Sequence, residues 1–199
     1  MNLAAYLAES AKILEQSRQA WSESLVTGAL NACVTALRDR RPVLVCGNGG
    51  SAADAMHLTA ELVGRFQLHR QALNVICLSS NPALLTAWAN DYTYDTVFSR
   101  QVEAYGVPGA VLLGISTSGN SHNVVTAFER ARAMGLKTIS LTGEGGGKLA
   151  ALSDYLFAVP SSSTPLIQQT HICLYHYLCD AIESELAGLA PGVNAAVSR

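Results

Sequence analysis

Short apolar runs alternate with longer, helix-like stretches through most of the chain. A run of a few residues that is apolar almost throughout is typical of a strand buried on both faces of a sheet. Such runs occur at 43–46, 73–78, 110–115, 137–141 and 155–159. The other segments space their apolar residues as helices do, and we expect helices at 52–66, 82–90, 96–105, 124–134, 148–152 and 166–186. This alternation predicts an α/β domain with a doubly wound, five-stranded parallel sheet and a long C-terminal helix.

Both ends of the chain fall outside this alternation. Residues 1–39 contain no strand, and their apolar spacing predicts two helices with a break at Thr27-Gly28. We expect these helices to form a hairpin or a contact between subunits. Residues 40–187 then make up the α/β domain. The final segment, 188–199, has little periodicity, so we expect a loose tail.

The first predicted strand runs into a glycine-rich turn and then a helix. The turn reads Gly47-Asn48-Gly49-Gly50-Ser51, and glycine lets a ligand approach the backbone closely. We expect Ser51 to be the N-cap of the helix that follows. The free N–H groups and the dipole of a helix N-terminus attract an anion. The turn lacks the final glycine of the dinucleotide fingerprint, so it predicts a phosphate-type site of another kind.

A second loop, 116–121, joins a later strand to a helix and is rich in hydroxyl groups. Its hydroxyls come from Ser116, Thr117, Ser118 and Ser121, gathered around Gly119. Hydroxyls and helix N-terminal amides suit a phosphate ester without a lysine. An ordinary helix cap is the alternative, but a cap needs one hydroxyl. Both loops follow the carboxyl ends of parallel strands, so we expect them at the same edge of the sheet.

Titratable residues stand on two of the predicted helices. His57 and Glu61 are four residues apart and share a helix face. On the apolar final helix, Gln168 and His176 lie roughly on one side, whereas His171 points away, so at most one of these histidines shares a site with Gln168. Two His, a Glu and a Gln can bind zinc. Glu61 and His176 can equally move protons, and the residues alone leave structural burial and catalysis equally open.

The pair Asn90-Asp91 is a further candidate, whereas the remaining histidines and the tryptophans have simpler explanations. Asp91 follows Asn90 in a polar break, and a helix-ending turn explains that pair by itself. We expect His69 and His122 at the surface. Trp21 and Trp88 are large enough to belong to the core or to an interface.

Composition narrows the function further. The chain has 199 residues, of which 49% are apolar and only 14% charged, so we expect some apolar surface to be hidden between subunits. A net charge of −2 offers no basic footprint for nucleic acid, and no apolar run is long enough to span a membrane.

The cysteines and the N-terminal residues indicate the cellular compartment of the protein. Five cysteines without paired spacing indicate a reducing cytoplasm, and we expect all five to be small buried apolar residues. The N-terminus lacks the basic region of a signal peptide. We therefore expect a cytoplasmic protein.

Five segments together resemble the sugar isomerase (SIS) family, most closely its members that isomerise seven-carbon sugar phosphates. They read CGNGGSAADAMHLTAEL, AWANDY, GISTSGNSHNVV, SLTGEGGGKLA and TPLIQQTHICLYHYLCDAIE, in order over about residues 40–186. The resemblance implies a flavodoxin-like SIS fold and a homotetramer with active sites at subunit interfaces. It also implies conversion of sedoheptulose 7-phosphate to D-glycero-D-manno-heptose 7-phosphate, toward lipopolysaccharide heptose or related glycans.

The resemblance also assigns roles to residues. It implies a phosphate-binding loop at Ser116, Thr117, Ser118 and Ser121, and further substrate contacts at Asn48, Gly49, Gly50, Ser51, Asp91 and Gln168. It implies an acid/base pair of Glu61 and His176. The same resemblance implies a zinc site at His57, Glu61, Gln168 and His176. The last two roles compete, because a glutamate that holds zinc is a poorer base.

Other functions remain open within the same fold. A close relative binds the DNA-replication initiator and lacks the catalytic pair, whereas Glu61 and His176 are both present here. A phosphosugar-sensing regulator is disfavoured because no DNA-binding segment is attached. An isomerase of a different sugar phosphate is the nearest alternative among enzymes, since the sequence does not set the length of the sugar.

Overall fold

The predicted sheet is present with all of its expected strands. A computed structural model describes residues 2–187. The strands are β1 (Val43–Gly47), β2 (Val75–Cys77), β3 (Val111–Ser116), β4 (Lys137–Thr142) and β5 (Tyr155–Ala158). All pairs are parallel and the order is β2-β1-β3-β4-β5. The α/β fold class with a five-stranded, doubly wound parallel sheet is therefore confirmed.

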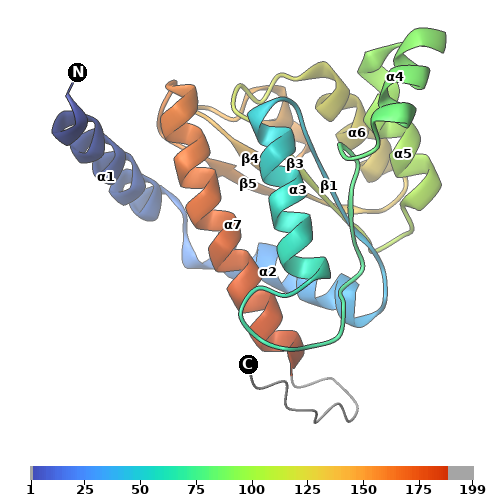
Figure 1. The fold of residues 1–199 in the computed structure, drawn as a ribbon, viewed down its shortest axis with the longest axis horizontal. Helices are drawn as coiled ribbons and strands as arrows, with labels where there is room; N and C mark the ends of the chain where they lie inside the picture. Colours follow the sequence, from blue (N-terminus) through green and yellow to red (C-terminus); the bar gives the residue numbers. More distant parts are fainter. Residues whose placement is uncertain (1, 188–199) are drawn as a thin grey trace.

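Helices cover both faces of the sheet (Figure 1). One face carries α2 (Glu23–Arg38), α3 (Gly50–Val63) and α7 (Thr164–Ala187). The other carries α4 (Pro82–Asp91), α5 (Val97–Tyr105) and α6 (His122–Ala133), with the short 3-10 helices η1 (Tyr94–Thr96) and η2 (Gly147–Leu152) beside them. Alternate strand residues serve the two faces, since Val43 and Val45 join the first core and Leu44 and Cys46 the second.

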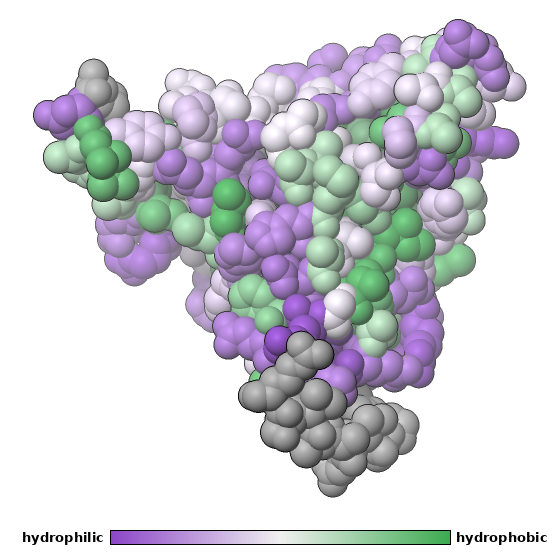
Figure 2. Space-filling model, in the orientation of Figure 1, coloured by the Kyte–Doolittle hydropathy of each residue, from purple (hydrophilic) through white to green (hydrophobic). Residues whose placement is uncertain are grey.

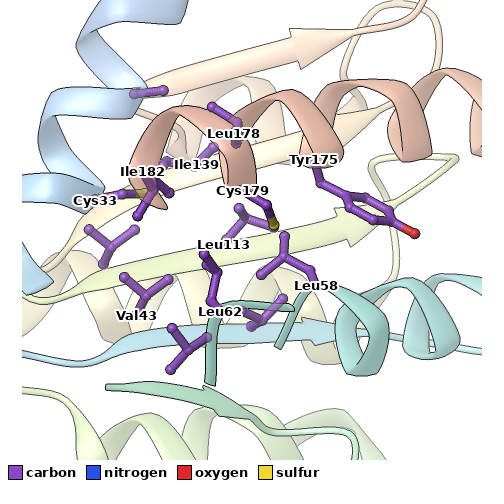
Figure 3. Close-up of a cluster of buried hydrophobic side chains, with 14 of the residues drawn as sticks. Cys33, Val43, Leu58, Leu62, Leu113, Ile139, Tyr175, Leu178, Cys179 and Ile182 are labelled. Atoms are coloured by element: carbon purple, nitrogen blue, oxygen red, sulfur yellow. The ribbon is translucent and has the colours of Figure 1, made fainter. Parts of the chain in front are cut away.

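The larger core holds α3 and α7 side by side on the sheet. Leu58 and Leu62 of α3 and Cys179 of α7 are almost completely buried and belong to one cluster with Leu113 of β3 (Figure 3). Burial of one such leucine stabilises the fold by about 1.5–3 kcal/mol. This packing fixes the two helices that carry the titratable residues.

The first helix break lies earlier than the sequence predicted. Helix α1 (Leu3–Ala20) ends at Trp21, and Ser22 caps α2 by accepting a hydrogen bond from Leu25 N. Gly28, expected at the break, lies inside α2. A side chain there would collide with the ring of Tyr155 on β5, so this glycine permits close packing rather than ending a helix.

Two other expectations are also wrong. Ser51 is not the N-cap of α3, because the helix already begins at Gly50 and Gly49 occupies the cap position without a side-chain bond. Cys173 is exposed on α7, whereas the other cysteines are buried. The expected loose tail, 188–199, lies outside the described residues.

Helix α1 stands apart from the two layers (Figure 1). Tyr6 is bonded through its hydroxyl oxygen to Gln169 Nε2 of α7, but Leu3 and Leu7 are exposed, and Figure 2 shows hydrophobic surface over α1. Within residues 2–187, no helix combines the length and apolar character needed to cross a membrane.

Candidate active site

The two predicted phosphate-type loops meet at the edge where the strand order reverses. β1 and β3 are neighbours, and their carboxyl ends lead into the glycine turn and the hydroxyl loop. Asn48 of the turn pairs with Asn123 of α6 through two amide hydrogen bonds of 2.8 and 2.9 Å. The Tyr94 hydroxyl donates to Asn48 Oδ1 at 3.0 Å. This switch point is where ligands bind in open α/β sheets.

The hydroxyl loop is held in one conformation by its neighbours. Gly119 N donates to Ser116 O at 2.9 Å, which closes a tight turn, and Gly119 has φ 65°. The Oγ atoms of Ser116 and Ser121 lie 2.9 Å apart. Gly143 N after β4 donates to Thr117 O at 2.9 Å. The loop therefore presents hydroxyls and the N-terminus of α6 from a rigid frame.

Gln168 lies beside the first turn of α3 rather than at its end. A side chain on Gly50 would collide with the Gln168 amide, so the two residues are in close contact. Ser51, the next residue, is buried. From Gly50 to His57 is about 10 Å along the helix axis. Gln168 is therefore near the glycine turn, and a role for it as a zinc ligand stays a prediction.

Three of the predicted titratable residues come together. Ligand atoms of His57, Glu61 and His176 all lie within 4.8 Å of one another. His57 Nε2 is 3.0 Å from Glu61 Oε1, and the two side chains are 47% and 24% exposed. His57 and Glu61 come from α3 and His176 from α7. The group is accessible to a small ligand.

The other histidine of α7, His171, lies away from the group of three. His171 is fully buried, and its Nε2 donates to the Thr142 carbonyl oxygen at 3.0 Å. Burial lowers the pKa of His171 to about 4, against the opposing effect of the Thr142 carbonyl. His171 is therefore neutral at pH 7 and takes no part in the group of three.

The donor set of this group suits zinc. It offers two imidazole nitrogens and a carboxylate, which are ligands that zinc takes at catalytic sites, and three protein ligands leave a position for substrate. The side chains sit on two packed helices, α3 and α7, which hold the donors close together.

Other predicted residues lie farther from this group. Asp91 is exposed at the end of α4 and accepts a hydrogen bond from Asn90. His69 and His122 are exposed, as expected. Trp21 Nε1 donates to Ala158 O, and Trp88 Nε1 donates to Thr96 Oγ1, so both rings are anchored and partly buried.

Tyr175 and Asp54 are functional candidates that the sequence did not reveal. The Tyr175 hydroxyl lies 3.0 Å from His57 Nδ1, on the opposite side of the ring from Glu61. Burial raises the pKa of Asp54, and burial together with the charge of Asp54 raises the pKa of Tyr175. A carboxylate one helical turn before His57, on an otherwise apolar stretch, was the available hint.

A buried ion pair behind the site was also missed. Arg70 Nε lies 3.1 Å from Glu183 Oε1, with both side chains 1% exposed. Glu183 also accepts hydrogen bonds from the backbone N–H groups of residues 66–68. Burial raises the pKa of Glu183, but these bonds and Arg70 outweigh it, so the pKa is lowered. Arg70 Nη2 donates to the Glu61 carbonyl oxygen at 2.9 Å. The pair thus ties α7 to the end of α3.

A cavity lies elsewhere, away from these groups. It measures about 380 Å³ and is lined by residues before β1 and β2 and by Leu186 near the end of α7. These segments belong to the amino-terminal edge of the sheet, opposite the two loops. The chemistry-bearing groups and this cavity are therefore separate features.

A family model and curated relatives match most of this chain. The model described as the SIS domain matches residues 5–143. Phosphoheptose isomerase from Crocosphaera subtropica is 53% identical over 156 residues, covering 78% of this chain and 79% of that protein. Phosphoheptose isomerase from Helicobacter pylori strain Shi470 is 50% identical over 174 residues, covering 87% of this chain and 90% of that protein.

Solved structures agree with these matches. Phosphoheptose isomerase GmhA from Neisseria gonorrhoeae superposes with a TM-score of 0.85 at 42% identity, covering 92% of this chain and 97% of that one. The phosphoheptose isomerase from Francisella tularensis gives a TM-score of 0.87 at 35% identity, covering 92% and 96%. The Vibrio vulnificus NanR protein, at 14% identity and a TM-score of 0.64, shares the fold alone.

Proposed function

The chain belongs to the SIS-domain family, and from this premise we propose that it is a phosphoheptose isomerase. Such an enzyme converts sedoheptulose 7-phosphate to D-glycero-D-manno-heptose 7-phosphate. The observation that carries the proposal is the group formed by His57, Glu61 and His176, with His57 and Glu61 on the helix that follows the glycine turn. A role like that of the relative that binds the DNA-replication initiator is less well supported, because that relative lacks the acid/base pair, whereas Glu61 and His176 are both present here.

The spacing of the two features fits a long sugar phosphate. A phosphate held by the loops lies near the N-terminus of α3, and His57 is about 10 Å further along that helix. An open-chain sugar of several carbons spans such a distance. The phosphate thus orients the carbonyl end of the sugar toward Glu61 and His176, which contributes to catalysis by positioning.

The proposed chemistry is proton transfer between adjacent carbons. Glu61 removes a proton from the carbon next to the carbonyl, which gives an enediolate, and returns the proton to the neighbouring carbon. His176 moves the hydroxyl proton from one oxygen to the other and stabilises the negative charge between these steps. The ketose becomes an aldose with no change in composition.

Zinc belongs to the proposal as a resident ion. His57, Glu61 and His176 would hold it, with Gln168 as a fourth candidate. When bound, zinc supplies Lewis-acid polarisation of the sugar oxygens. Because a ligating glutamate is a weaker base, the comparison of zinc-free and zinc-loaded protein tells which role Glu61 has.

We also place this enzyme in the cytoplasm as a homotetramer with active sites at subunit interfaces. The exposed leucines of α1 support an assembly, since they leave an apolar helix face for another copy to cover. The unpaired cysteines agree with a reducing compartment.

The test is conversion of sedoheptulose 7-phosphate by purified protein, stripped of metal and then supplied with zinc. We expect aldose formation, and we expect Glu61→Gln to lose about 10²–10⁴-fold in kcat, the usual contribution of a general base. His176→Asn should lose a similar factor. Calorimetry should show that Glu61→Gln still binds the sugar phosphate.

Two matched controls use exposed residues. Glu185→Gln removes a carboxylate on α7, and His69→Asn removes a surface imidazole; both should retain wild-type turnover. Full activity of Glu61→Gln would contradict the mechanism. No turnover by the wild type in either metal state would favour another sugar phosphate or a partner-binding role.

A further inference from the structure

Tyr175 connects the group of three to a buried carboxylate that the isomerisation steps do not use. Its side chain leaves α7 beside His176, is 0% exposed, and places its hydroxyl 3.0 Å from His57 Nδ1. Its ring packs edge-on against both histidines, with centroids 5.6 Å from His57 and 4.9 Å from His176. Figure 3 shows the hydroxyl pointing out of the apolar cluster. Tyr175 is therefore placed to orient His57.

Asp54 faces the same hydroxyl from one turn earlier on α3. The residue is 8% exposed, and among the described residues its Oδ2 has no hydrogen-bond partner. A buried carboxylate oxygen without a donor is costly. An arrangement that gives Asp54 a donor is therefore favoured.

The number of available hydrogens explains why an oxygen of Asp54 lacks a hydrogen-bond donor. The Tyr175 hydroxyl has a single hydrogen and two acceptors within reach, His57 Nδ1 and the Asp54 carboxylate. His57 Nε2 lies 3.0 Å from Glu61 Oε1, and in one tautomer of the neutral ring Nε2 carries the hydrogen and donates it to this carboxylate. In that tautomer Nδ1 accepts the Tyr175 hydrogen, so the Tyr175 hydroxyl cannot donate to Asp54 as well.

We propose that Tyr175 and Asp54 are positioning residues that favour His57 with its Nε2 lone pair free toward the site. In that arrangement Nδ1–H donates to the Tyr175 oxygen, and Tyr175 turns its own hydrogen to Asp54. Nε2 loses one hydrogen to water and Nδ1 gains one from water, so the ring stays neutral. The Nδ1–H of His57, the Tyr175 hydroxyl and the buried Asp54 carboxylate are then all paired, and Nε2 and Glu61 both present lone pairs to a cation.

This inference rests on the proposed role of His57 as a zinc ligand and names what supports that ligand. A metal-bound histidine usually donates its other N–H to a fixed partner, and loss of that partner typically weakens metal binding by about 10–100-fold. Here the partner is a tyrosine backed by a carboxylate. The hydrogen bonds from Asp54 through Tyr175 to His57, called the relay below, act on His57 alone. They are therefore separate from the proton transfers of Glu61 and His176.

The test uses two measurements that do not depend on turnover. Long-range ¹H–¹⁵N spectra of the metal-free protein report which His57 nitrogen carries hydrogen, and competition with a chelating dye reports zinc affinity. We expect the wild type to hold the ring hydrogen of His57 on Nδ1, and Tyr175→Phe to shift that hydrogen toward Nε2. Zinc binding of Tyr175→Phe should be about 10–100-fold weaker.

The control is Tyr177→Phe, which removes an exposed hydroxyl two residues along α7 and should match the wild type in both measurements. Asp54→Asn is a second test that keeps Tyr175 and should also weaken zinc binding. In the double variant the two effects should not add, because both act through one relay.

Wild-type zinc affinity and a wild-type nitrogen pattern in folded Tyr175→Phe would overturn the proposal. If that variant does not fold, the same result in Asp54→Asn would overturn it. If the wild type binds no zinc, the metal part of the proposed function fails. The His57 nitrogen pattern then decides on the relay alone.

Discussion

The ion pair of Arg70 and Glu183 gives the first prediction at the scale of single residues. Loss of one partner leaves a buried charge without its counterion, which costs about 3–5 kcal/mol. Three backbone N–H groups still stabilise Glu183. We therefore expect Arg70→Met to lower the free energy of unfolding by about 3 kcal/mol, measured by urea denaturation.

An exposed arginine provides the comparison. Arg38 lies in the last turn of α2 and is exposed, so Arg38→Met should change the free energy of unfolding by less than about 0.5 kcal/mol. Arg70→Met should also lower turnover, because Arg70 holds the Glu61 carbonyl oxygen. Equal stability of the two variants would show that the buried pair contributes little.

His171 predicts how stability depends on pH. Burial lowers its pKa in the folded protein to about 4, whereas in the unfolded chain it is about 6.5. Between these values the unfolded chain binds more protons, so the free energy of unfolding falls as the pH drops. From pH 7 to pH 5 this residue should account for a loss of about 2 kcal/mol.

The measurement is denaturation of wild type, His171→Gln and His69→Gln at both pH values. His171→Gln should have the shallower dependence, because its side chain does not titrate and can still donate to Thr142 O. His69 is exposed, so His69→Gln should follow the wild type. The window lies above the range in which Glu183 loses its charge, since the pKa of Glu183 is lowered. Identical slopes for all three proteins would refute the assignment.

At the scale of elements, the sequence predicted the features that a continuous run of residues encodes, namely the strands and the loops that follow them. Strands buried on both faces stay apolar throughout, so all the strands were found to within a few residues, and strand ends placed the two loops at one edge. The sequence placed a helix break at Gly28 because a glycine often ends a helix. A glycine can also permit close packing, and here its packing partner, Tyr155, is too distant in sequence to be recognised. Tyr175 and Asp54 escaped prediction because their meeting depends on the rotation of α7 against α3.

The hydroxyl loop provides a prediction about one element. Gly119 has a positive φ of 65°, and a side chain there would collide with the Gly146 carbonyl oxygen of the next loop. Gly119→Ala should push the two loops apart and weaken sugar phosphate binding by at least about 10-fold, or 1.4 kcal/mol. Calorimetry in the Glu61→Gln background measures binding without turnover.

Gly145→Ala is the matched comparison. Gly145 also has a positive φ, 74°, but a side chain there meets nothing within 4 Å. Gly145→Ala should lower the free energy of unfolding by about 1–2 kcal/mol, because alanine is strained in the left-handed conformation. Binding of the sugar phosphate should be unchanged. If both variants bind the sugar phosphate equally, the loop contact does not shape the phosphate site.

At the scale of the whole molecule, one face of helix α1 is left uncovered by the rest of residues 2–187. Leu3, Leu7 and Leu14 of α1 are 72%, 57% and 36% exposed, and their spacing places them on one face. Their neighbours Tyr6 and Ile13 already pack toward the body of the protein. In a chain with only 14% charged residues, this leucine face fits the covered interface of an oligomer.

The leucine face makes the proposed assembly testable. Leu7→Glu puts a charge into the face and should shift the protein to smaller assemblies, measured by light scattering after size-exclusion chromatography. Gln16→Glu adds the same charge on the opposite side of α1, where the residue is exposed, and should leave the assembly intact. If active sites lie between subunits, turnover falls together with the assembly in Leu7→Glu. An unchanged assembly in Leu7→Glu would mean that the leucine face is free in solution and that subunits meet elsewhere.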